Sequence, residues 1–150
     1  EILTMGRSKL IFLDIDGVLV NRWSLMQRGG MNAPFAPSCL QALNRIVEQT
    51  KADIVITSTW RLGMKIAEIK KLMKGRGVKG RIVGLPPDLM LTRGTEIAAW
   101  LEENGPVKSF VILDDGSDVG PHKDRLVQTK FEIGLTAEDA DQAMEILNEQ

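Results

Sequence analysis

Short apolar runs alternate along the chain with segments in which apolar residues recur at helical spacing. Each run is bounded by turn-forming residues, as expected for buried strands joined by crossover helices. This alternation predicts an α/β fold with a parallel sheet of about five strands flanked by helices in three layers. The predicted strands are Lys9 to Ile15 (KLIFLDI), Asp53 to Thr57 (DIVIT), Arg81 to Gly84 (RIVG), Ser109 to Leu113 (SFVIL) and Leu126 to Gln128.

Four segments have the helical period, and their ends carry residues suited to helix termini. Proline favours the first turn of a helix, threonine favours the N-cap, and glycine often follows the last turn. The helices are predicted from Pro37, over Leu62 to Gly75, from Thr92 to Gly105, and after Thr136. Their inward faces are predicted to be Leu40, Leu43, Ile46 and Val47; Leu62, Ile66, Ile69 and Met73; Ile97, Trp100 and Leu101; and Ala143, Ile146 and Leu147.

The length of 150 residues fits a single domain spanning 1–150. Residues 1–8 are expected to be a disordered leader, with Met5 as a candidate natural start. Residues 21–36 are rich in Gly, Asn and Pro from Trp23 onward, which predicts a loop here called the flap. The flap is too short to be a folded domain over the sheet.

The net charge of −1 gives no global positive field that would attract nucleic acid or a membrane surface. The single cysteine cannot form an intramolecular disulfide, and the chain has no long apolar run that could span a bilayer or serve as a secretory signal. We therefore expect a cytoplasmic protein without a membrane partner; the sequence indicates no protein partner.

Acidic and hydroxyl side chains gather where the predicted strands end, which is where parallel sheets bind ligands. Clustered carboxylates repel one another unless a cation compensates them, and an all-oxygen ligand set suits Mg²⁺. The sequence therefore predicts a magnesium site. The side chains concerned are Asp14 and Asp16 after the first strand, Thr57, Ser58 and Thr59 after the second, and Asp114, Asp115 and Asp118 after the fourth.

Three motifs in this order resemble the haloacid dehalogenase superfamily: DIDGV at 14–18, TST at 57–59 and LDDGSD at 113–118. The resemblance implies a Rossmann-like fold and a magnesium-dependent phosphatase. Asp14 would be the nucleophile that forms an aspartyl-phosphate, and Asp16 would be the general acid and base, with its carbonyl near the metal. Asp114 would be a metal ligand, Asp118 stands at the spacing of a second acidic position, and Asp115 could take either part.

The resemblance also implies a hydroxyl donor after the second strand and a basic residue before the fourth. Ser58 is favoured for the hydroxyl, with Thr57 as a close rival because adjacent strand residues point to opposite faces. Arg93 is chosen as the basic residue although the family more often has lysine, because arginine also binds phosphate well. Arg61 is the reserve candidate.

Structural explanations compete at several positions. The DDGSD segment is also good loop sequence, so Asp115 and Asp118 could simply be solvated. Cys39 and Trp100 are interpreted as core, His122 as a loop residue, and the basic run from Lys74 to Arg81 as a solvated face. Trp23 and Trp60 could stack on a base, but packing is favoured for both.

The absence of a large cap implies an open site that admits bulky or polymeric phosphates. The motifs are similar to those of capless members associated with RNA repair and polynucleotide end processing. A nucleotide or nucleic-acid end is therefore the preferred substrate, ahead of sugar phosphates or phosphoproteins. Alternatives are a catalytically silent phosphate- or metal-binding module and a phosphotransferase that uses an alcohol acceptor.

Overall fold

The computed structural model describes residues 9–149, and in these residues five strands form one parallel sheet. The strand order is β3-β2-β1-β4-β5, so the first strand of the chain is central. The predicted α/β fold with a Rossmann-like parallel sheet is confirmed. The strands are β1 (Leu10–Leu13), β2 (Asp53–Ile56), β3 (Ile82–Gly84), β4 (Phe110–Asp114) and β5 (Leu126–Gln128).

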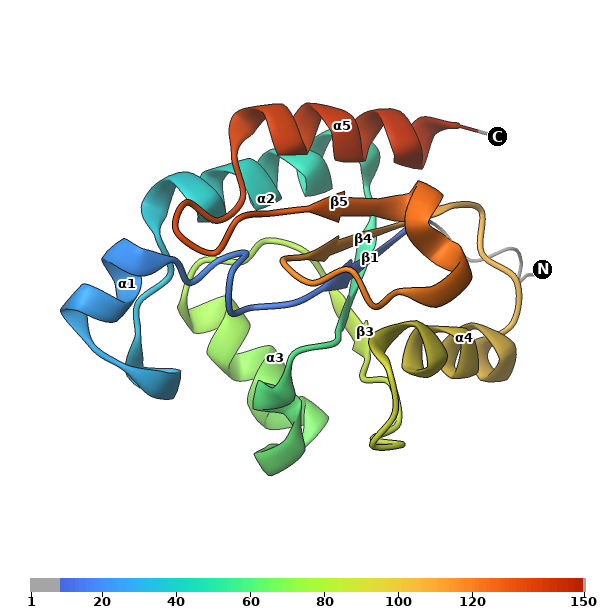
Figure 1. Ribbon diagram of the computed structural model, residues 1–150, viewed down its shortest axis with the longest axis horizontal. Coiled ribbons are helices and arrows are strands. Elements are labelled where there is room, and N and C mark those ends of the chain that lie inside the picture. The colour runs from blue at the N-terminus through green and yellow to red at the C-terminus, as the bar shows by residue number, and fades with distance from the viewer. Residues whose placement is uncertain (1–8, 150) are drawn as a thin grey trace.

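Helices cover both faces of this sheet. Figure 1 shows α2 and α5 side by side over one face, with α4 on the opposite side. Proline starts α2, and Thr92 and Thr136 cap α4 and α5 through their side chains, as the sequence predicts. The helices are α1 (Arg22–Gln27), α2 (Pro37–Thr50), α3 (Ile66–Gly75), α4 (Arg93–Asn104) and α5 (Ala137–Asn148), with 3-10 turns η1 (Gly30–Asn32), η2 (Thr59–Gly63) and η3 (Gly120–Arg125).

The buried side chains form two clusters, because successive residues of a strand point to opposite faces. Ile11 and Leu13 of β1 belong to the larger cluster, which also takes buried residues of α2, α3 and α5. Leu10 and Phe12 belong to the smaller cluster with α4, where the Phe12 and Trp100 rings meet edge to face at 5.7 Å. The strand β1 is therefore buried on both faces, and the acidic residues follow directly from its end.

Two local predictions were wrong. The helix predicted from Leu62 begins only at Ile66, because Ser58 caps a separate 3-10 turn through the backbone N–H of Trp60. Leu62 is 54% exposed and Ile66 38% exposed, so neither belongs to a buried face. The flap also contains a helix, α1, because Asn21 and Ser24 form a capping box at its start.

No helix among residues 9–149 combines the length and apolar character needed to cross a membrane. The predicted leader at 1–8 lies outside the described residues.

Candidate functional site

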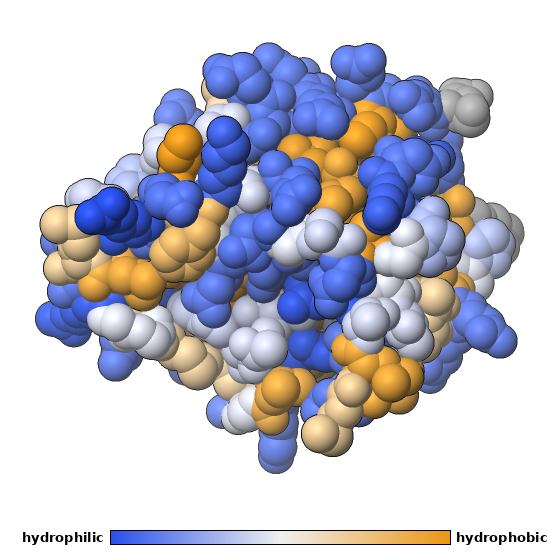
Figure 2. Space-filling model, in the orientation of Figure 1, coloured by the Kyte–Doolittle hydropathy of each residue, from blue (hydrophilic) through white to orange (hydrophobic). Residues whose placement is uncertain are grey.

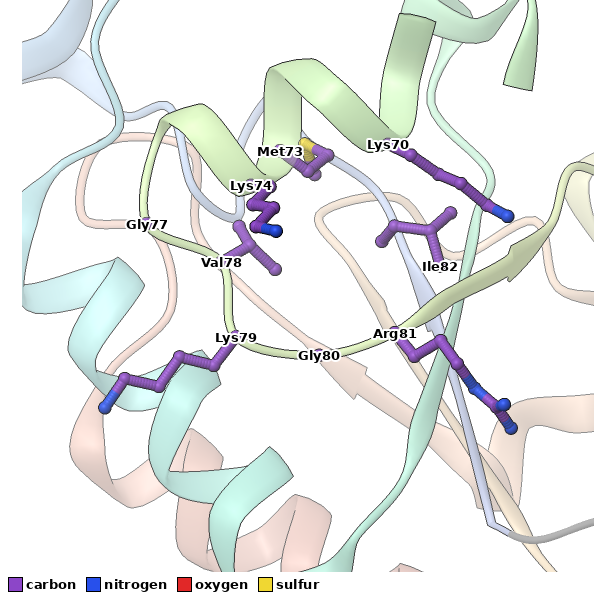
Figure 3. A pocket seen from close by; sticks show the side chains of 9 residues that line it. All are labelled: Lys70, Met73, Lys74, Gly77, Val78, Lys79, Gly80, Arg81 and Ile82. Atoms are coloured by element: carbon purple, nitrogen blue, oxygen red, sulfur yellow. The ribbon is translucent and has the colours of Figure 1, made fainter. Parts of the chain in front are cut away.

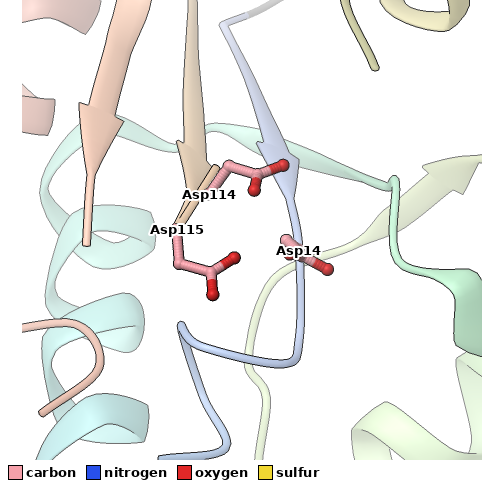
Figure 4. A group of neighbouring side chains, drawn as sticks. All are labelled: Asp14, Asp114 and Asp115. Atoms are coloured by element: carbon pink, nitrogen blue, oxygen red, sulfur yellow. The ribbon is translucent and has the colours of Figure 1, made fainter. Parts of the chain in front are cut away.

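Three carboxylates meet at the carboxyl ends of β1 and β4. The two strands run side by side with Leu13 opposite Leu113, and the Asp14 N–H donates to the Leu113 carbonyl at 3.0 Å. Carboxylate oxygens of Asp14, Asp114 and Asp115 lie within 4.8 Å of one another. Figure 4 shows the three side chains near one another at the strand ends, with Asp114 and Asp115 extending from β4 toward β1. Asp14 and Asp114 are buried and Asp115 is half-buried, so the cluster is largely shielded from solvent.

Backbone geometry brings the acidic segments together. Gly17 has a φ of +84°, a region that side-chain-bearing residues rarely adopt, and a Cβ there would collide with the Asp115 side chain. On the other strand the Gly116 N–H donates to Asp114 Oδ1 at 2.9 Å. The Thr129 hydroxyl, after β5, holds the Gly17 carbonyl at 2.6 Å. Both acidic loops are thus held in place by hydrogen bonds.

Arg93 supplies the positive charge of the cluster from the first turn of α4. Its Nη1 lies 2.7 Å from Asp114 Oδ2, 3.8 Å from Asp14 Oδ1 and 3.0 Å from the Thr57 hydroxyl. The structure therefore brings Arg93 and Thr57 to the carboxylates. Gly94 permits this approach, because a Cβ at that position would collide with the backbone of Val119.

Ser58 and Arg61 have other partners. The Ser58 hydroxyl accepts the Trp60 N–H at 3.2 Å as the cap of η2. Buried Arg61 donates to the carbonyls of Thr57 and Ser58 and forms an ion pair with Glu96 at 3.0 Å. Between the two rivals, it is the Thr57 hydroxyl that reaches the cationic group of the cluster, whereas Ser58 was favoured from sequence. Arg61 braces the loop that carries both.

Asp16 and Asp118 stand apart from the group of three carboxylates. Asp16 Oδ2 accepts the indole N–H of Trp60 at 3.2 Å. Exposed Asp118 has Oδ2 at 3.5 Å from the Arg93 backbone N–H, and its charge acts on Asp114. Asp118 therefore faces the start of α4 at the rim of the cluster.

The cluster carries uncompensated negative charge. Burial, followed by repulsion from Asp114, raises the pKa of Asp14 from 3.8 to about 7, although Arg93 and the Ile15 N–H act in the opposite direction. Burial also raises the pKa of Asp114, which Arg93 and the Gly116 N–H partly offset. One arginine does not neutralise three carboxylates. A divalent cation together with Arg93 would neutralise them. The oxygen donors and their excess negative charge therefore fit a hard metal ion.

Other residues singled out from sequence lie away from the cluster. Cys39 is buried beside Asn21, and Trp100 lies in the core. His122 is in η3, where its ring packs edge-on against Phe110. Trp23 is 46% exposed on the flap, and Figure 2 shows apolar surface around α1 on that side of the molecule.

The basic run borders a groove of about 580 Å³ between α3 and β3 (Figure 3). The groove lies before the start of β3, at the opposite end of the sheet from the carboxylates. Lys79 pairs with Glu48 at 3.1 Å and Arg81 with Asp53 at 2.9 Å. This surface is thus separate from the candidate site.

Sequence reasoning missed the part that Trp60 and Arg76 play. Trp60 was weighed only as a stacking or packing residue, yet it binds Asp16, and Arg76 packs on Trp60 instead of lying free in the basic run. The position of a tryptophan directly after a hydroxyl-rich strand end was the available signal. Its partner 44 residues earlier could not be identified without the fold.

The family model for the HAD domain in Swiss Army Knife RNA repair proteins matches residues 10–140 of the chain. The search of curated proteins found no significant match to the chain.

Proposed function

The chain belongs to this family of HAD domains, and on that premise we propose that it is a magnesium-dependent phosphomonoesterase acting through an aspartyl-phosphate on Asp14. The observation that carries the proposal is the meeting of Asp14, Asp114 and Asp115 with Arg93 and Thr57 at one end of the sheet. These groups come from three strand ends and one helix start. An anionic nucleophile, a cation and a hydroxyl donor within one site are what phosphoryl transfer requires.

In the first step Asp14 attacks the phosphorus in line with the leaving oxygen. The hydrogen bond from the Ile15 N–H to Asp14 Oδ1, at 2.8 Å, fixes the orientation of this carboxylate. The new bond joins a carboxylate oxygen to phosphorus, and the bond from phosphorus to the leaving alkoxide breaks. Asp16 gives its proton to that alkoxide, which departs as an alcohol.

In the second step water attacks the phosphorus of the aspartyl-phosphate. Asp16, now a carboxylate, takes a proton from the water, the acyl-phosphate bond breaks, and Asp14 and inorganic phosphate are released. One residue thus serves as acid and then base. Its position two residues after Asp14, beyond the end of β1, brings it into the same loop.

Arg93 and Thr57 bind the phosphoryl oxygens in this proposal. The guanidinium already lies 3.0 Å from the Thr57 hydroxyl, so both can donate to one phosphoryl group. Ser58 and Arg61 serve indirectly, as the cap of η2 and the brace of the loop. The preorganised donors offset charge that develops on the equatorial oxygens.

Mg²⁺ would be held by the carboxylates of Asp14, Asp114 and Asp115 and by the Asp16 carbonyl, with Asp118 at the rim. The metal, when bound, supplies charge neutralisation for the phosphoryl oxygens. Burial, and after it repulsion from Asp114, raises the pKa of Asp14, and a cation held by these carboxylates would lower that pKa and favour the ionised nucleophile.

We propose a nucleotide or a nucleic-acid end as the substrate. The matching family is named for RNA repair proteins, which supports a nucleic-acid-related phosphate. The flap is the one insertion after β1, and it is far smaller than a folded cap domain, which suits a polymeric substrate. Sugar phosphates, phosphoproteins and an alcohol acceptor in place of water are the competing outcomes.

The proposal is tested by magnesium-dependent hydrolysis of p-nitrophenyl phosphate and of RNA and DNA with terminal phosphates. Wild type should be active with Mg²⁺ and inactive with a chelator, and Asp14→Asn should fall to background. Asp141→Asn is the matched control, because the Asp141 carboxylate is exposed on α5 and pairs with Arg45 at the surface. Acid-quenched wild type should carry hydroxylamine-labile phosphate that Asp14→Asn lacks.

Two results would decide against the proposal. Equal rates for wild type and Asp14→Asn would contradict the nucleophile, and phosphate binding without turnover on any substrate would favour the silent module. Higher kcat/KM for sugar phosphates or phosphopeptides than for every nucleic-acid end would overturn the substrate class alone.

A further inference from the structure

Trp60 is the described residue that holds the carboxylate of Asp16. The Trp60 side chain is 5% exposed, and its Nε1 lies 3.2 Å from Asp16 Oδ2. An indole N–H only donates, and a buried donor needs an acceptor, so this contact has a fixed direction. Oδ2 is therefore the oxygen that accepts this bond, and Oδ1 is left to exchange a proton with the leaving group.

The Trp60 ring is itself held by two side chains. The Phe35 ring, from the end of the flap, lies 6.2 Å from it, centroid to centroid. The Arg76 guanidinium lies 5.3 Å from the Trp60 ring and 4.9 Å from the Phe35 ring. Cation–π contacts at these distances are attractive, and more so where solvent is partly excluded.

Arg76 also fastens the flap to the body of the protein. It follows the last turn of α3, and its two terminal nitrogens donate to the carbonyls of Ala33 at 2.8 Å and Met31 at 2.7 Å. Burial lowers the pKa of Arg76, in accord with a guanidinium that has exchanged water for these partners. One side chain thus joins α3, the flap and Trp60.

We propose that Trp60 is a positioning residue for Asp16, and that Arg76 couples the flap to this acid–base group through the Trp60 ring. The inference rests on the proposed function, because it assigns Asp16 to proton transfer. Trp60 binds one oxygen of Asp16 and leaves the other to exchange the proton with the leaving group. The Arg76 contacts that fasten the flap to the end of α3 thereby also hold the Trp60 ring that binds Asp16.

The test uses the dependence of the reaction on the leaving group. An alkoxide needs protonation as it departs, whereas p-nitrophenolate departs without it, so misplacing the acid slows only substrates with poor leaving groups. The parameter kcat/KM reports the steps up to transfer of the phosphoryl group to Asp14. The later hydrolysis of the aspartyl-phosphate therefore does not affect it. Trp60→Phe keeps an aromatic ring and removes the N–H.

We expect Trp60→Phe to lower kcat/KM for a nucleoside 5′-monophosphate by about tenfold or more, with p-nitrophenyl phosphate changed less than about threefold. Arg76→Met should give the same pattern with a smaller loss. Trp23→Phe and Arg81→Met are the matched controls, because Trp23 is exposed on the flap and Arg81 pairs with Asp53. Neither control should change the ratio of the two substrates.

A second readout does not depend on turnover. The chain has three tryptophans, so ¹⁵N-labelled protein should show three indole N–H resonances, and Trp60→Phe identifies one of them. That resonance should move upfield in Asp16→Ala and shift in Arg76→Met, but stay in place in Arg81→Met. Thermal melts of all variants establish that they are folded.

Failure of the inference and failure of the proposed function give different results. If wild type is active and Trp60→Phe slows both substrates equally, or neither, Trp60 does not position the acid. If wild type hydrolyses no phosphomonoester, the proposed function fails, and an indole resonance unmoved by Asp16→Ala would overturn the contact as well.

Discussion

Replacing Asp14 by asparagine should stabilise the metal-free protein at alkaline pH, although the same change should abolish activity. Burial and the neighbouring Asp114 raise the pKa of Asp14 to about 7 in the folded state, against 3.8 for the ordinary carboxyl. Between these values the folded state holds a proton that the unfolded state has lost. Folding stability therefore falls as pH rises through this window, and the loss is complete above pH 7.

The size of this loss follows from the two pKa values. At about 1.4 kcal/mol per pH unit, the difference between 3.8 and about 7 corresponds to about 4 kcal/mol at pH 8. The asparagine side chain in Asp14→Asn cannot ionise and can still accept the Ile15 N–H, so this variant should recover most of that energy. At pH 4 the advantage should shrink below about 1 kcal/mol, because Asp14 is then protonated in the folded state.

Urea unfolding from pH 4 to pH 9 measures this effect, once with a chelator and once with Mg²⁺. Magnesium should stabilise wild type by about 3 kcal/mol at a concentration of 100 times its Kd, and Asp14→Asn much less. Asp141→Asn, an exposed carboxylate, should differ little from wild type at any pH. Two results for the metal-free proteins would refute the reasoning. In one, Asp14→Asn is no more stable than wild type at pH 8; in the other, its stability advantage over wild type is as large at pH 4 as at pH 8.

Two further predictions concern the elements that support the site. Arg61→Leu should lower the free energy of unfolding in urea by about 3 to 5 kcal/mol, because it leaves Glu96 buried without its cationic partner. The double variant Arg61→Leu/Glu96→Leu should recover much of that loss. If the losses of the two single variants simply add in the double variant, the two residues are not coupled. Gly94→Ala should lower kcat/KM by displacing the start of α4, and Arg93 with it, since the new Cβ meets a backbone carbonyl. Gly75→Ala, with nothing within 4 Å of the new Cβ, should leave turnover unchanged, and equal rates for both variants would exclude the displacement.

The sequence alone determines the sheet and the place of the acidic cluster. A short, nearly continuous apolar run such as KLIFL predicts a strand covered on both faces, and the acid after such a strand lies at the carboxyl edge of a parallel sheet. The proximity of Asp14 and Asp114 could be predicted for this reason, because parallel strands place their carboxyl ends at one edge of the sheet. The caps Thr92 and Thr136 act within three residues, so they too could be identified from sequence.

Where two residues carry the same functional group, only the tertiary structure decides which of them contacts the site. Thr57 and Ser58 both carry hydroxyls, and only the backbone after β2 determines that Thr57 meets Arg93. Arg61 and Arg93 are both cations near the site, and Glu96 draws Arg61 inward. The bond from Trp60 to Asp16 joins segments that only the packed sheet brings together. Local patterns carry the periodicity and the caps, whereas the direction of a side chain at a strand end depends on what packs around it.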